Sequence, residues 1–137
     1  MRVEIVEKLI ELFKADERLA YPEKVKRYHF GFSPAPRDYP FISVRWAGES
    51  HRRETPTKRR LEISFEVAIL DQSVVEDQAE KSVMEKVEAV CDVVASNPTL
   101  DGLVEEAWIS GIESETGVRG SYAVVGALIT IITRKTV

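Results

Sequence analysis

The chain has 137 residues, of which 44% are hydrophobic and 31% are charged, and its formal net charge is −4. This length fits one domain, and the apolar content is high enough for a folded core, which excludes an intrinsically disordered chain. No apolar run approaches the roughly 18 residues that a membrane-spanning helix needs. The single cysteine, Cys91, excludes an internal disulfide framework. The acidic balance argues against a dedicated nucleic-acid binder, which usually carries a broad basic face.

The first predicted element is an amphipathic helix over residues 2–16. Glu4 and Lys8 form an i,i+4 pair of opposite charge on its polar side. Pro22 blocks any continuation of the helix, because proline lacks the amide hydrogen that a helix interior uses. The apolar residues recur at helical spacing and are predicted to form one buried face: Val3, Val6, Leu9, Ile10 and Phe13.

Three strands are predicted next, over residues 24–30, 41–46 and 61–70. The first is short and stops at a loop that is rich in glycine and proline. The second follows Pro40 directly and is rich in residues that favour strands. The third alternates cleanly between apolar and polar residues, which predicts one face toward a core and one toward water. Its apolar set is Leu61, Ile63, Phe65, Val67 and Ile69.

The segment from Gly48 to Arg60 is too long and too charged for a tight turn, and we expect it to project as a hairpin arm. Residues 51–60 carry a net charge of +4, so the rest of the chain carries −8. A solvated loop is the simplest interpretation, and contact with an acidic protein surface or with nucleic acid are the alternatives. No aromatic residue is interleaved to stack on bases. The candidate contact residues are Arg52, Arg53, Lys58, Arg59 and Arg60.

A second amphipathic helix is predicted to open at Asp71 to Ser73. Ser73 and Glu76 have the spacing of a capping box, and Asn97-Pro98 ends the helix. Its predicted apolar face consists of Val75, Ala79, Val83, Val87, Val90, Cys91 and Val94.

Two further strands are predicted over residues 104–114 and 121–133. Residues 115–120 join them and supply Gly117 and Gly120 for a turn. The last strand is apolar on both faces, which favours a central position or a cover provided by a neighbouring subunit. The candidate subunit contacts on it are Val125, Ile129 and Ile131, or the residues that alternate with them.

The expected element order is α-β-β-β-α-β-β, in a single domain over residues 1–137. Two amphipathic helices and five strands most simply form a two-layer α+β domain, with both helices on one face of a mostly antiparallel or mixed sheet. The hairpin arm would project from that sheet between its second and third strands.

The chain carries no recognisable catalytic motif: it has no glycine-rich phosphate loop, no GxSxG, no HExxH and no CxxC. His29 and His51 stand 22 positions apart in different predicted elements, which disfavours a shared metal site. Glu113 and Glu115 would share one face of a strand, where strand-edge charges that discourage aggregation are the simpler interpretation. We therefore expect a protein that is not an enzyme and that uses no cofactor and no metal.

The whole-chain pattern resembles the tail terminator and related tail-completion proteins of long-tailed bacteriophages, the class that includes minor tail protein U. The resemblance rests on an N-terminal helix followed by Tyr21-Pro22, on the strand entry Asp38 to Val44 (DYPFISV), and on a third strand that leads directly into a long helix. It also includes Trp108 to Gly117 (WISGIESETG) and Tyr122 to Ile132 (YAVVGALITII).

The resemblance implies a non-enzymatic virion protein that is assembled in the host cytoplasm and located in the tail or neck. Such proteins form a ring, often a hexamer, which caps the tail tube and provides the surface onto which the head docks. The implied partners are further copies of the chain, the tail tube protein and the connector proteins of the neck. DNA is implied only as passing cargo, and no membrane is involved.

Three alternatives stay open. One is a head–tail connector or stopper protein of the same neck region. A second, of a different class, is a small nucleic-acid-binding or regulatory α+β module that uses the basic loop 51–60. The third is a small enzyme without a recognisable motif.

Overall fold

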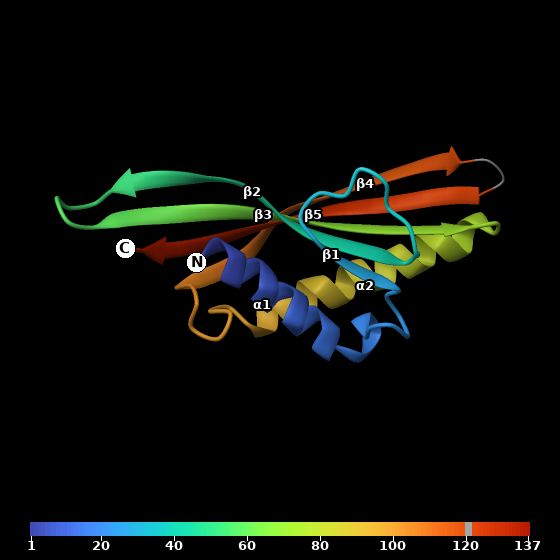
Figure 1. Cartoon of the computed structure of the whole chain (residues 1–137), viewed down its shortest axis with the longest axis horizontal. Coiled ribbons are helices and arrows are strands. Elements are labelled where there is room, and N and C mark those ends of the chain that lie inside the picture. Colours follow the sequence, from blue (N-terminus) through green and yellow to red (C-terminus); the bar gives the residue numbers. More distant parts are fainter. Residues whose placement is uncertain (120–121) are drawn as a thin grey trace.

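The computed structural model describes residues 1–119 and 122–137, and it confirms the element order α-β-β-β-α-β-β in a two-layer α+β fold (Figure 1). A five-stranded mixed sheet forms one layer, and two helices pack on one of its faces. The helices and strands are α1 (Arg2–Ala15), a single 3-10 turn η1 (Glu17–Leu19), β1 (Arg27–Phe30), β2 (Phe41–Arg53), β3 (Arg59–Ser73), α2 (Glu76–Ser96), β4 (Glu106–Arg119) and β5 (Tyr122–Thr136).

The strand order in the sheet is β1-β2-β3-β5-β4. β1 pairs with β2 in parallel, whereas the other three neighbouring pairs are antiparallel. β4 is therefore one edge of the sheet. At the other edge β1 covers only residues 41–44 of β2, so the rest of β2 has a strand neighbour on one side alone.

The hydrophobic core lies between the helices and one face of the sheet. The alternation predicted for the third strand is confirmed, because every second residue from Leu61 to Ile69 is buried. In α1 the buried face is rotated from the prediction: Ile5 belongs to it, whereas Val3 is 55% exposed. The buried residues of α1 are Ile5, Val6, Leu9 and Phe13.

The strands run further than the apolar pattern predicts. β2 and β3 stay paired out to Arg53 and Arg59, so the arm is a regular antiparallel ladder with a short turn at residues 54–58. A bulge between Trp46 and Gly48 interrupts the ladder once, and Gly48 takes a φ of +115° there, a conformation that glycine adopts readily. Figure 1 shows this hairpin at one end of the molecule.

The connection predicted over residues 115–120 is wrong for most of its length. β4 continues to Arg119, since its backbone remains paired with β5 along this stretch. Gly120 and Ser121, the predicted turn glycine and the predicted first residue of the last strand, lie outside the described residues. The β4–β5 hairpin and the β2–β3 hairpin extend toward opposite ends of the molecule (Figure 1).

The predicted start of the second helix is also corrected. β3 continues its ladder with β5 through Ser73, so α2 begins only at Glu76, after Val75, which is 44% exposed. The Ser73 hydroxyl accepts a hydrogen bond from the Val75 amide (3.0 Å) and closes a local turn instead of capping the helix. The side chain of Glu76, the other half of the predicted capping box, lies outside the described residues. Within the described part of the chain, neither helix combines the length and the apolar character that crossing a membrane demands.

Candidate assembly surfaces

The chemically reactive side chains of the chain lie apart from one another. No group of three or more His, Cys, Asp or Glu side chains is arranged to hold a metal ion among residues 1–119 and 122–137. His29 stacks on Phe41 at a ring distance of 6.2 Å, whereas His51 contacts Glu49. His29 is paired with Ser43, eight positions before His51 on β2, so roughly 26 Å of strand separates the two imidazoles. Burial raises the pKa of the Cys91 thiol, which keeps it protonated at neutral pH.

The arm carries cations that oppose one another. The register of the hairpin places Arg52 directly across from Arg60 and Arg53 directly across from Arg59. Like charges at directly opposed positions destabilise a sheet. Arg60 alone is relieved, by an ion pair with Glu54 at 2.8 Å. The cations without an ion-pair partner in the described part of the chain are Arg52, Arg53, Lys58 and Arg59, and all are exposed.

Two contacts hold the arm against the body of the protein, one beside its turn and one at its base. Arg59 exchanges both backbone hydrogen bonds with Val137, at 2.8 and 2.9 Å. On the other strand, the Arg2 guanidinium at the start of α1 donates to the Glu49 carboxylate, which also contacts His51. These two partners, Arg2 foremost, lower the pKa of Glu49 to about 2. The expected projecting hairpin is therefore smaller than predicted: β3 stays paired with β5 as far as Arg60, so only the turn at residues 54–58 extends beyond the sheet, and the exposed cations flank this turn or lie in it.

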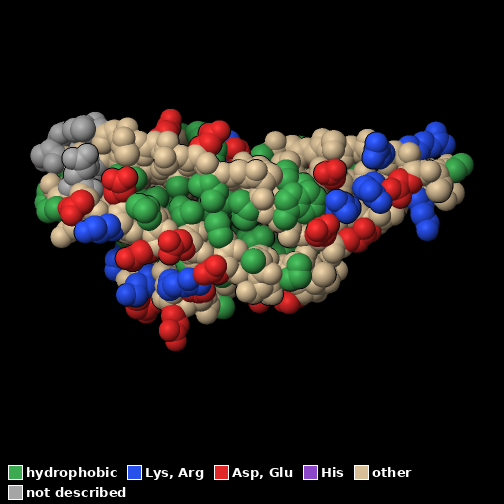
Figure 2. All heavy atoms as spheres, turned by 180° about the vertical axis from the view of Figure 1, so that it is seen from behind, with side chains coloured by type: hydrophobic (Ala, Val, Ile, Leu, Met, Phe, Trp, Pro, Cys, Tyr) green, Lys and Arg blue, Asp and Glu red, His purple; other side chains and the backbone are tan. Residues whose placement is uncertain are grey.

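A groove runs between α2 and the β4 edge of the sheet. It has a volume of about 380 Å³. Met84 and Ile112 are 58% and 48% exposed on its walls, which is unusual for large apolar side chains. Figure 2 shows hydrophobic side chains gathered in a band across this side of the molecule, with acidic side chains along one border and the basic arm at the far end. The groove is lined by Val83, Met84, Val87 and Ile112, with Glu80 and Glu88 at its rim.

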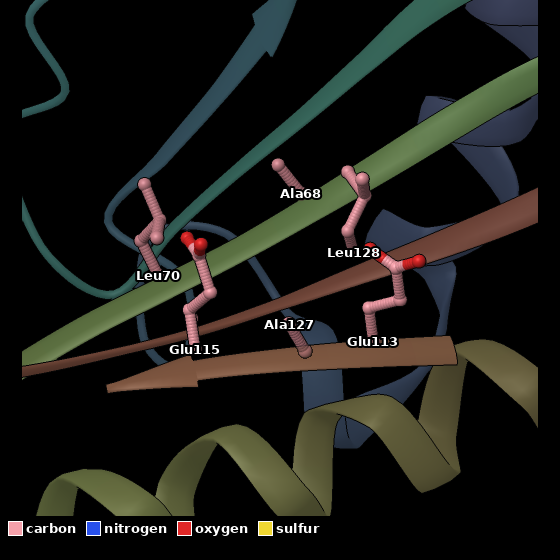
Figure 3. Close-up of a pocket in the computed structure, with 7 residues that line it drawn as sticks. Ala68, Leu70, Glu113, Glu115, Ala127 and Leu128 are labelled. Atoms are coloured by element: carbon pink, nitrogen blue, oxygen red, sulfur yellow. The ribbon is translucent and has the colours of Figure 1, made fainter.

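A second hollow, of about 220 Å³, lies on the sheet face away from the helices. Glu113 and Glu115 share this face, as their spacing predicts, and their carboxylates lie beside Leu70 and Leu128 (Figure 3). Both glutamates are exposed, and neither forms an ion pair within the described residues. The β4 edge thus presents carboxylates on one side and the apolar groove on the other.

The predicted subunit contacts on the last strand require a correction. Val125 is 5% exposed and Ile129 and Ile131 are fully buried, because the chain's own helices cover this face. A strand that is apolar on both faces does not reveal which face its own domain covers. The face that remains partly exposed is the alternate one, with Val124, Leu128 and Ile132.

Sequence reasoning missed an aromatic group at the edge opposite β4. Phe30 and Trp46 are 49% and 53% exposed, and Phe32, which follows β1, is 68% exposed. Phe30 is paired with Val44, so Trp46 follows two residues later on the neighbouring strand. The Arg45 guanidinium lies 5.8 Å from the Phe32 ring. The one sequence signal for this exposure is the Ala47-Gly48 step after Trp46, since a glycine inside a strand often marks a bulge.

Comparison with known proteins shows a common fold. No family model matches the chain, and no curated protein matches it. Among solved structures, it is similar to a chain of "Virion of native gene transfer agent (GTA) particle", with a TM-score of 0.55, 12% sequence identity, and coverage of 92% of this chain and 91% of that chain. The two chains share their fold over almost their whole lengths.

Proposed function

We propose that this chain is a non-enzymatic structural protein of a virion, which forms a ring that caps the tail tube and offers the surface onto which the head docks. The observation that carries the proposal is the whole-chain fold likeness to a chain of a gene transfer agent virion. The resemblance of the sequence to phage tail-completion proteins supports the finer assignment to the tail terminator.

The surface properties of the subunit agree with a role in assembly. Large apolar side chains stand exposed at both edges of the sheet, and the arm holds four cations that find no ion-pair partner among the described residues. Exposed apolar patches and unneutralised charge of this kind are typical of surfaces that are covered in a complex. In a ring of identical subunits, each subunit would cover these surfaces of its neighbour.

The test is made on the particle whose genome encodes the chain. We expect purified particles to contain the chain in a small fixed number of copies at the junction of head and tail. Deleting its gene should leave heads and tail tubes unjoined, and expression in trans should restore joining. Particles that lack the chain, or that join normally without it, would contradict the proposal.

A connector or stopper protein of the same neck region is the nearest alternative. The two roles differ in which structure still forms without the chain. Loss of a terminator should release tail tubes of irregular length, whereas loss of a stopper should leave tubes of normal length beside heads that lose their DNA. Electron micrographs of the deletion lysate distinguish these outcomes.

The basic arm supports the second candidate, a nucleic-acid-binding module. Such a module should bind duplex DNA with an affinity that falls steeply as salt rises, because each neutralised phosphate releases a counterion. A mobility-shift titration of the purified chain at low and at moderate salt tests this. We expect no binding beyond the weak, salt-labile level of a small cationic patch.

A further inference from the structure

The two edges of the sheet carry unlike and complementary surfaces. The strand order places β4 at one edge and the unpaired part of β2 at the other. These edges face away from each other across the sheet, so they cannot meet within one subunit. The surface called the free β2 edge consists of Phe30 at the end of β1 together with Trp46, Arg52 and Arg53 of β2.

The free β2 edge combines an aromatic part with a cationic part. Phe30 ends β1 opposite Val44, Trp46 follows two residues later on β2, and both are about half exposed. Arg52 and Arg53 follow on the same strand, without an ion-pair partner among the described residues. Tryptophan and arginine are among the residue types most enriched at the energetic centres of protein interfaces.

The groove between α2 and β4 has the opposite character. Its walls expose Met84 and Ile112, and the glutamates beside it form no ion pair in the described part of the chain. Lys81 of α2 is paired with Asp77 and leaves these glutamates free. The glutamates of the groove are Glu80 and Glu88 on α2, while Glu113 and Glu115 lie on the opposite face of the same edge strand, β4.

We propose that the free β2 edge of one copy docks into the α2–β4 groove of the next copy. The aromatic side chains enter the apolar groove, and the arm cations lie against the groove glutamates Glu80 and Glu88. The choice of a second copy as occupant rests on this charge complementarity, since unpartnered cations and unpartnered carboxylates occur on the same chain in surfaces that it cannot join to itself. The contact also relieves the repulsion between the opposed arginines of the arm.

A contact between two different surfaces of identical subunits is head-to-tail, and it closes into a ring when the rotation between neighbours permits. The inference rests on the proposed function for the ring but adds the residues that build it. It predicts that each subunit uses one aromatic edge and one groove, so that removing either surface from all copies prevents assembly.

The test uses two single variants and their mixture. Trp46→Glu removes the aromatic edge but keeps the groove, and Met84→Lys blocks the groove but keeps the edge. Each variant alone should associate about 30-fold or more weakly than the wild-type chain, as expected for the loss of a central anchor. Mixed together, the two variants should form a one-to-one dimer and nothing larger, because only one productive contact remains. Val3→Glu, at an equally exposed apolar residue of α1, is the matched control and should assemble normally.

A disulfide trap covers the case in which free subunits associate weakly. The variant Trp46→Cys/Met84→Cys/Cys91→Ser should yield a ladder of crosslinked multimers under oxidation at high protein concentration, whereas each single-cysteine chain should stay monomeric. Assembly of the Trp46→Glu chain like wild type, a mixture that stays monomeric, or the absence of a ladder would overturn the inference. A groove that captures the tail tube protein instead would overturn it as well.

Failure of this inference is distinguishable from failure of the proposed function. If particles incorporate the Trp46→Glu chain and join normally, the docking surfaces are wrong while the virion role stands. If the wild-type chain is absent from the particle, the virion role fails whichever surfaces the copies use.

Discussion

Phe65 lies in the middle of the covered face of the sheet and is fully buried between its strand neighbours and the helices. Its position follows from the strict alternation of apolar and polar residues along β3. Because one face of the strand is exposed to water, the apolar residues must all lie on the face toward the core. Glu49, at the base of the arm, contributes through an ion pair and not through burial in the core. Its carboxylate holds the start of α1 against β2 through Arg2.

We expect Phe65→Ala to lower the free energy of unfolding by about 3–5 kcal/mol, because the substitution removes a buried ring and leaves a cavity. Denaturant melts measure the change. Phe32→Ala, at a 68% exposed ring, is the control and should change it little. A loss below about 1 kcal/mol for Phe65→Ala would mean that this face is not the core.

The ion pair of Glu49 should make part of the free energy of unfolding depend on pH. The pKa of Glu49 is lowered to about 2 by Arg2 and His51, so the folded state binds the proton less readily than the unfolded chain does. The stabilisation from this contact is fully present above pH about 4.5 and disappears as the pH falls toward 2. We expect the wild-type chain to be more stable than Glu49→Gln at neutral pH. The difference should shrink on acidification, and a difference that stays constant down to pH about 2 would contradict the assignment.

At the scale of elements, the sequence predicts the number, type and order of helices and strands correctly but misplaces several ends. The amphipathic periodicity of α1 and the alternation of β3 are strong because each has one buried face. The arm continues as a ladder through charged residues, so no apolar alternation marks β2 beyond Trp46 or β3 before Leu61. The burial of Ile129 depends on which face the helices cover, and that is decided by tertiary packing.

The sequence predicts the charged part of the candidate surfaces but not their apolar part. The cations of the arm are visible as a local charge cluster in the sequence. The exposure of Trp46 depends instead on the shortness of β1, which leaves the strand beside it uncovered. The groove needs α2 and β4 together, two elements whose contact no local pattern encodes.

The arm should matter for assembly and not for folding. We expect Arg52→Ser/Arg53→Ser/Arg59→Ser to fold with a melting temperature equal to or slightly above that of the wild-type chain, because opposed like charges are removed. Arg60 is kept, since it is paired with Glu54. Self-association of this variant should be weaker than that of the wild-type chain. Because salt screens exposed ion pairs, the wild-type contact should itself lose part of its strength at high salt.

The matched control for the arm is Lys24→Ser/Lys26→Ser/Arg37→Ser, which removes the same charge from exposed positions outside both surfaces. Circular dichroism melts follow folding, and sedimentation velocity follows association. If the arm variant assembles and completes tails as the wild-type chain does, the arm is a solvated hairpin without a role in assembly.

At the scale of the whole molecule, charge and apolar surface are distributed unevenly along one sheet. Residues 51–60 of the arm carry a net charge of +4 in a chain whose net charge is −4. The arm projects from one end, and the β4–β5 hairpin extends toward the other. An elongated subunit with unlike surfaces at its opposite edges is suited to contacts that repeat from copy to copy. In the proposed ring, the contact between unlike edges would repeat from copy to copy until the ring closes.

The most direct measurement is a cryo-electron microscopy reconstruction of the junction between head and tail in the particle that encodes the chain. The account predicts one closed ring of copies of this chain on the end of the tail tube, in which Trp46 of each copy lies in the Met84–Ile112 groove of the next. A reconstruction in which the chain lies outside any ring, or in which no copy occupies the junction, would contradict it.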